Sequence, residues 1–280
     1  MALVFAAIAP HGGLAIAEAC TAEERELAAA TRAGMEELGV RFAASRPQAV
    51  VVATPHNVHI GGAVGVLVTG RVAGRLEGAP SIALDVPVEM TLAWLVLDAL
   101  AAAGVPAVGV SFGGNEPAGA VAPMDWGVLI PLWFMGGRSD PPLPVVVVTP
   151  SRDLTAAEHI QAGEAIAAAA EASALRVGFI ASADHGHAHT AAGPYGYHAD
   201  ARKYDELICS LVREERLDRL CEIPAEVVDR AKADSWWQLL MLHGATIRGW
   251  RGRLISYEAP TYFGMLTAAY EPVAGEDRPS

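Results

Sequence analysis

The sequence predicts a single α/β domain with a central, mainly parallel, twisted sheet and helices on both of its faces. Short apolar runs rich in β-branched residues alternate with Ala-rich stretches long enough to form helices. Such alternation is typical of parallel strands joined by crossover helices. Several runs contain no polar residue, as in residues 49–53, which is typical of strands buried on both faces. A chain of 280 residues fits one large domain of this class.

Each predicted strand lies in one of the apolar runs, at residues 3–9, 49–53, 64–69, 106–112, 144–148, 176–181 and 253–258. Each predicted helix lies in an Ala-rich or amphipathic stretch, at residues 22–38, 88–103, 156–172, 199–216, 224–232 and 235–244. Thr155 precedes the third helix and Glu158 follows three residues later, which predicts a capping box. Residues 70–80 are expected to form a hairpin or surface excursion. We expect residues 1–272 to form the domain and residues 273–280 to form a flexible tail.

The composition excludes several classes of protein. The net charge is −12 and Lys and Arg are not clustered, which argues against a nucleic-acid-binding protein. The three cysteines include no Cys-x-x-Cys pair, which favours a reducing cytoplasm. The amino terminus has no basic region before its apolar stretch, so we predict no secretory signal. Apolar segments are interrupted by Pro or charge before reaching ~20 residues, so no membrane-spanning helix is expected.

Histidines follow three of the predicted strands. His11 comes after the first strand and His56 after the second, each directly preceded by proline. Three histidines, His185, His187 and His189, follow the strand at residues 176–181. Because ligands bind at the carboxyl ends of the strands in open α/β sheets, these histidines could converge on one metal or one substrate.

A metal site built from two histidines usually needs an anionic ligand as well. Glu258 ends the last predicted strand and therefore lies at a strand end, although an exposed loop carboxylate is the commoner fate of a glutamate. Two histidines and one carboxylate leave open positions on one face of a ferrous ion, as in non-haem Fe(II) oxygenases.

The segment at residues 184–189 supports a second hypothesis. If it is extended, alternation places His185, His187 and His189 on one face, where they could bind zinc in a hydrolase. The acid that the metallo-β-lactamase signature places before its last histidine is absent, because Ala188 stands there.

Several motifs, taken together, resemble one enzyme family. The chain resembles the class III extradiol ring-cleavage dioxygenases, the superfamily of the protocatechuate 4,5-dioxygenase catalytic subunit. The order and spacing of the motifs carry the resemblance, which spans most of the chain. The motifs are Pro10-His11-Gly12, Thr54-Pro55-His56, residues 180–187, residues 193–197 and Ser256-Tyr257-Glu258.

The resemblance implies roles for particular residues. His11, His56 and Glu258 would bind Fe(II), and His187 would act as the acid/base. His185 is an addition to the family's pattern, so the choice between His185 and His187 stays open. The resemblance also implies an α/β fold with helices on both sides of a sheet.

The implied reaction is Fe(II)-dependent opening of the aromatic ring of a catechol-type or 2-aminophenol-type substrate with O2. We expect His59, Trp126, His185 and Tyr197 to lie near the substrate; Trp126 stands where many relatives carry histidine. A non-catalytic relative of the Memo type stays an alternative. The resemblance also implies a homo-oligomer, and some relatives work with a small partner subunit.

Overall fold

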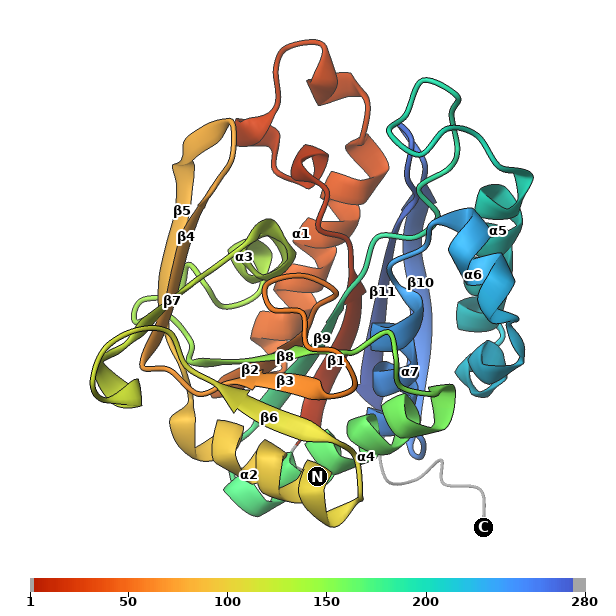
Figure 1. Ribbon diagram of the computed structural model, residues 1–280. Helices are drawn as coiled ribbons and strands as arrows, with labels where there is room; N and C mark the ends of the chain where they lie inside the picture. The colour runs from red at the N-terminus through yellow and green to blue at the C-terminus, as the bar shows by residue number, and fades with distance from the viewer. Residues whose placement is uncertain (1–2, 274–280) are drawn as a thin grey trace.

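The computed structural model describes residues 3–273 and confirms the predicted α/β domain (Figure 1). Its eight-stranded sheet has the order β10-β11-β1-β9-β2-β8-β3-β6. These strands are β1 (Leu3–Ala9), β2 (Ala49–Ala53), β3 (Val64–Leu67), β6 (Ala107–Val110), β8 (Val145–Thr149), β9 (Val177–Ser182), β10 (Trp250–Glu258) and β11 (Met265–Pro272). The sequence predicted all of these except β11.

The centre of the sheet is parallel and its flanks are mixed. Strands β1, β9, β2 and β8 are parallel neighbours. At one flank β11 pairs antiparallel with both β1 and β10, and at the other β3 is antiparallel to β8 but parallel to β6. The parallel centre brings the carboxyl ends of β1, β9 and β2 to one edge.

A second sheet stands beside the first and was only partly predicted. Its order is β5-β4-β7, with β4 (Arg71–Leu76) and β5 (Ala79–Pro87) forming an antiparallel hairpin in the expected region. The alternating burial of β5 is a period-two signal that sequence reasoning missed. Strand β7 (Val121–Pro123) is too short to show a period.

Helices cover both faces of the large sheet (Figure 1). Helices α1 and α3 lie on one face, α2, α4 and α7 on the other, and α5 packs against β10 at its edge. Their bounds are α1 (Ala29–Ala44), α2 (Met90–Ala102), α3 (Trp126–Phe134), α4 (Ala156–Ser173), α5 (Ala199–Arg213), α6 (Ala225–Ala231) and α7 (Trp236–Ala245). The predicted capping box of Thr155 and Glu158 is confirmed. None of the described helices combines the length and apolar character needed to cross a bilayer.

The first helix begins later than predicted, and Glu258 binds its first turn. The sequence predicted a helix over residues 22–38, whereas α1 covers Ala29–Ala44 and only a short 3-10 turn, Glu24–Glu26, precedes it. Oε1 of Glu258 accepts a hydrogen bond of 2.6 Å from the backbone N–H of Thr31, in the first turn of α1. A carboxylate at this position accepts a hydrogen bond from an otherwise unpaired N–H, and its negative charge interacts favourably with the positive end of the helix dipole.

Helices α4 and α7 cross at two glycines. A Cβ on Gly163 would collide with the carbonyl oxygen of Met241, and one on Gly244 with that of Ile160. The helices therefore approach each other backbone to backbone. Because α7 begins directly after Asp234 and Ser235, this crossing also fixes the position of Asp234.

Gly163→Ala should lower the free energy of unfolding by about 1–3 kcal/mol, because the added methyl group must separate the two helices. Gly119→Ala is the matched control, since nothing lies within 4 Å of a Cβ at that position. Urea unfolding of both variants measures the difference. Equal stability of the two variants would contradict the close crossing.

Candidate metal centre and its cavity

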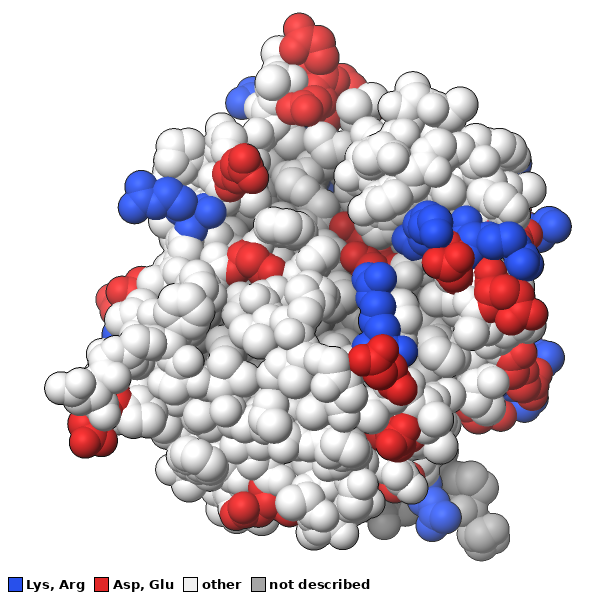
Figure 2. Space-filling model, viewed as in Figure 1, with Lys and Arg blue, Asp and Glu red and all other residues white. Residues whose placement is uncertain are grey.

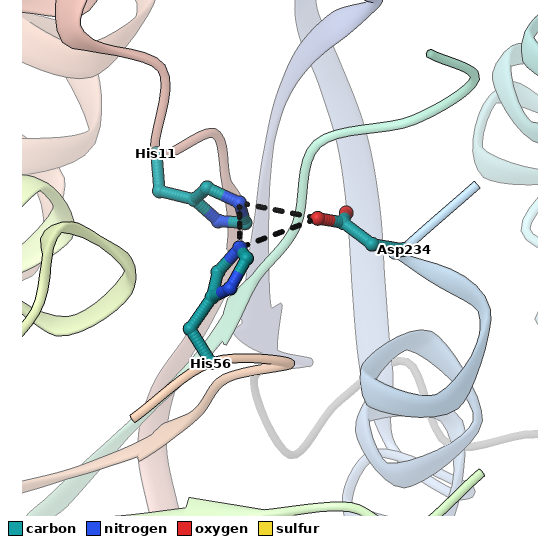
Figure 3. Close-up of side chains that lie close together, drawn as sticks. All are labelled: His11, His56 and Asp234. Carbon is teal, nitrogen blue, oxygen red and sulfur yellow. Dashed lines mark hydrogen bonds and ion pairs between the residues drawn. The ribbon is translucent and has the colours of Figure 1, made fainter. Parts of the chain in front are cut away.

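His11, His56 and Asp234 converge on one point at the carboxyl edge of the sheet (Figure 3). His11 follows β1, His56 follows β2, and Asp234 precedes α7. The Nε2 atoms of the two histidines lie 3.2 Å apart. Oδ2 of Asp234 lies 3.4 Å from Nε2 of His11 and 3.5 Å from Nε2 of His56. Three potential ligand atoms thus face one another.

The orientation of His11 is set by β9. Its Nδ1 lies 3.0 Å from Oγ of Ser182, which itself donates a 2.5 Å hydrogen bond to the carbonyl oxygen of Gly127. Because the hydroxyl hydrogen is used there, Ser182 accepts from His11, so Nδ1 carries a hydrogen and Nε2 faces the cluster. The backbone N–H of His11 donates to Oδ1 of Asp184 at 3.1 Å. Such contacts behind a ligand hold its ring in place.

The loop that carries His56 is tied to helix α3 by Asp125. Asn57 has a φ of 75°, a left-handed conformation that asparagine tolerates better than most residues. Its N–H donates to Oδ2 of Asp125 at 2.5 Å, and its side-chain oxygen accepts from the N–H of Asp125 at 3.2 Å. Oδ1 of Asp125 also caps α3 by accepting from Val128 at 3.3 Å.

Buried charges dominate the electrostatics of the site. Burial lowers the pKa of His11, but the carboxylates of Asp184 and Asp234 outweigh burial and raise it to about 9. Burial likewise opposes ionisation of Asp234, yet His11 holds the pKa of that carboxyl below its usual range. Burial raises the pKa of Asp184. The site therefore attracts positive charge.

The donor set fits a divalent transition metal. Oδ1 of Asp234 is buried and has no hydrogen-bond partner among the described residues, so this carboxylate is only partly satisfied by protein. Ligand atoms bound at about 2.1 Å to a common ion are roughly 3.0–3.4 Å apart, close to the separations observed. Two imidazoles and one carboxylate suit both Fe(II) and Zn²⁺.

The cluster opens into a cavity of about 1060 Å³. Aromatic and titratable side chains line it, among them Trp126, Asp184, His187, Tyr195, Tyr262 and Phe263. The ring of Trp126 lies 4.8 Å from that of His56, and the ring of Tyr195 lies 6.0 Å from that of His187. One exposed aromatic side chain thus stands beside each of two histidines.

His187 faces the cavity and His185 does not. The Nδ1–H of His187 donates to the carbonyl oxygen of His185 at 2.8 Å, which leaves Nε2 without a proton in the neutral ring. Its ring stacks on Phe263 with centroids 5.3 Å apart. His185 is fully buried, neither ring nitrogen has a described partner, and burial lowers its pKa. The geometry favours His187 as the residue that can meet a ligand.

Asp205 fixes the segment on both sides of His187. This buried carboxylate accepts from the N–H of Gly186 at 2.8 Å, from Nε2 of His189 at 2.8 Å and from the hydroxyl of Tyr257 at 2.7 Å. The ring of His189 is therefore held by Asp205. Accordingly, His185, His187 and His189 form no group that could share a metal ion within the described range 3–273, which removes the basis of the zinc-hydrolase hypothesis.

The structure does not bring Glu258 together with His11 and His56, where the sequence led us to expect it. Glu258 binds the N-terminus of α1 and does not line the cavity. Asp234, which sequence reasoning missed, takes the third place. The available signal was an aspartate directly before the predicted helix at residues 235–244.

Of the other residues expected near the substrate, one lines the cavity and two do not. Trp126 lines the cavity, whereas His59 is exposed outside it and Tyr197, 65% exposed, is also absent from its wall. Tyr197 forms a β-bridge with His189, and Tyr195, two residues earlier, reaches the cavity instead.

Two proteins from other organisms are similar to this chain. Protein CA_C1420 of Clostridium acetobutylicum is 21% identical over 253 residues, which are 89% of this chain and 53% of that protein. The chain thus spans about half the length of this curated relative. The crystal structure of the uncharacterized protein JW3007 from Escherichia coli K12 has the same fold, with a TM-score of 0.63, 18% identity and coverage of 95% of this chain and 99% of that one.

The family follows from a match over nearly the whole chain. The profile described as the catalytic LigB subunit of aromatic ring-opening dioxygenase matches residues 5–265. These residues include His11, His56, His187 and Asp234. The chain belongs to the LigB family.

Proposed function

We propose that this protein is an Fe(II)-dependent extradiol dioxygenase that opens the ring of a catechol-type or 2-aminophenol-type substrate. The convergence of His11, His56 and Asp234 in the wall of an aromatic-lined cavity carries the proposal. Bound there, Fe(II) would supply open positions for a diol and O2 and would lower the pKa of a bound hydroxyl.

His187 is the proposed acid/base. Its Nε2 can accept a proton from a substrate hydroxyl, because Nδ1 is held by the carbonyl oxygen of His185. Phe263 stacks on the ring and keeps it in one plane. A histidine so placed can return the proton later in the reaction, and such help contributes ~10²–10⁴-fold to a rate.

The cavity favours a substituted aromatic substrate. Trp126 and Tyr195 offer aromatic surfaces beside the histidines, and aromatic rings prefer offset or edge contacts with such surfaces. The cavity, at about 1060 Å³, lies at the large end of ligand pockets, which are roughly 300–1,000 Å³. Arg75, Arg152 and Lys232 share its wall with Glu24 and Asp229, so polar substituents of either charge can find a partner.

Asp234→Asn should weaken Fe(II) binding by more than ~100-fold, because the substitution removes the anionic ligand and its charge. Glu258→Gln is the matched control: it removes a carboxylate outside the cluster and should retain iron. Iron content after anaerobic loading and gel filtration measures both. Loss of iron in Glu258→Gln with retention in Asp234→Asn would reverse the assignment.

The wild-type protein, loaded anaerobically with Fe(II), should consume O2 and form a product with a new visible band on a panel of catechols and 2-aminophenols. His187→Gln should retain iron but lose turnover by ~10²–10⁴-fold, because it lacks an acid/base. Oxygen uptake and iron content are measured on the same samples. A folded, iron-loaded wild-type protein that consumes no O2 across the panel would favour a non-catalytic relative.

The metal-free protein should lose stability as the pH rises from about 6.5 to 9. The pKa of His11 is raised to about 9, above the ~6.5 of an unfolded histidine. Protonated His11 therefore contributes fully to the free energy of unfolding below pH ~6.5, and this contribution is lost as the pH rises through 9. Urea unfolding of chelator-treated wild type and His11→Gln across this range isolates the effect. Parallel pH profiles for the two proteins would contradict it.

A further inference from the structure

Asp205 is a buried carboxylate in a helix that carries charged side chains at the surface. Charged side chains of both signs gather over α5 and α6 in the space-filling view (Figure 2), and Glu206, the next residue of α5, is exposed. Asp205 itself is only 1% exposed. Burying a carboxylate is costly unless hydrogen bonds compensate for the lost water, so the donors around Asp205 indicate what its burial achieves.

Three hydrogen-bond donors from two separate segments meet this carboxylate. Its Oδ1 accepts from the N–H of Gly186 at 2.8 Å. Its Oδ2 accepts from Nε2 of His189 at 2.8 Å and from the hydroxyl of Tyr257 at 2.7 Å. Burial and the negative charge of Asp205 raise the pKa of Tyr257, so this hydroxyl stays protonated and donates. Two of the three donors thus lie on either side of His187, and the third belongs to β10.

The same carboxylate packs against the loop between β10 and β11. A Cβ on Gly264 would collide with Oδ2 of Asp205, so a glycine is needed for the loop to approach the carboxylate this closely. Gly264 directly follows Phe263, whose ring stacks on that of His187 with centroids 5.3 Å apart and planes 16° apart. Asp205 is therefore in contact both with the segment that carries His187 and with the loop that carries its stacking partner.

Backbone hydrogen bonds join these two segments. The N–H of His185 donates to Gly264 at 2.8 Å, that of Gly264 to Gly186 at 3.1 Å and that of His189 to Tyr262 at 3.2 Å. These bonds set how the two segments lie relative to each other. The carboxylate completes the arrangement, because it is held by groups from both segments and is anchored in turn by helix α5, which packs against β10.

We propose that Asp205 is a positioning residue for proton transfer, whose hydrogen bonds hold the ring of His187 stacked on Phe263 with Nε2 facing the cavity. Asp205 does not line the cavity, so it acts through His187 and does not touch a substrate. An acid/base must lie within about 2.6–3.2 Å of the atom that gives up the proton, and a displacement of ~1 Å can lower a rate by ~10²-fold. The inference rests on the proposed function, in which His187 is the acid/base.

A double-mutant cycle separates positioning from general stability. Asp205→Ala should lower kcat by ~10–10²-fold and leave iron content and KM nearly unchanged, because the metal ligands and the cavity wall come from other residues. In the His187→Gln background the same substitution should have no further effect on kcat, because the ring through which Asp205 acts is gone. Iron content, kcat and KM of the four proteins are measured with one catechol substrate.

Two further variants complete the cycle. Glu206→Ala is the matched control, since it removes an exposed carboxylate from the next position of α5 and should leave kcat unchanged. Tyr257→Phe removes one donor but leaves the carboxylate in place, so it should cause a smaller fall in kcat that also depends on His187. This milder variant decides the matter if Asp205→Ala does not fold. An equal fall in kcat in both backgrounds, or no fall in either, would overturn the proposal.

Proton NMR of the protein loaded with diamagnetic Zn²⁺ tests the position of the ring without turnover. Stacking on Phe263 should shield the ring protons of His187, whose signals are assigned by their loss in His187→Gln. Asp205→Ala should move these signals toward those of an exposed histidine, and Glu206→Ala should not. Signals that stay in place in Asp205→Ala would overturn the proposal. If they move although the wild type consumes no O2, the positioning is supported and only the proposed function fails.

Discussion

The site depends on the position of β9 between β1 and β2, parallel to both. In this register Ala9 lies beside Ser182, and Ala53 lies beside Ala181. The chains that leave β1 and β2 therefore emerge at one level, on either side of β9. Ser182, the last residue of β9, binds the ring of His11 and turns its Nε2 toward His56. The backbone pairing of three strands thus determines a contact between two residues 45 positions apart.

The two carboxylates, Asp234 and Glu258, show where sequence reasoning succeeds and fails. The edge of the sheet and the convergence of His11 and His56 followed from the apolar runs and the residues after them. The third residue of the cluster could not be predicted in this way, because a glutamate at a strand end can bind either a metal or a helix N-terminus. Glu258 meets the first turn of α1. Asp234 reaches the cluster only because α7 is packed closely on α4, a tertiary contact with no local signal.

The segment that carries His185, His187 and His189 illustrates a second limit. Period-two reasoning requires an extended strand, but this segment is held in a loop by two separate parts of the chain. The N–H of His185 donates to Gly264, that of His187 to Ala231 and that of His189 to Tyr262. Each histidine consequently occupies a different environment, namely the core, the cavity wall and the carboxylate of Asp205. The three closely spaced histidines could identify this segment as part of a functional site. Only the long-range contacts show that His187 is the histidine that faces the cavity.

Charge balance links the metal centre to the rest of the fold. Asp184 and Asp234 lie buried beside His11, and buried carboxylates need a positive partner. A proton on His11, whose pKa these carboxylates raise to about 9, meets part of that need. A divalent ion meets it more fully but requires the proton to leave. Proton and metal are therefore competitors for one buried position.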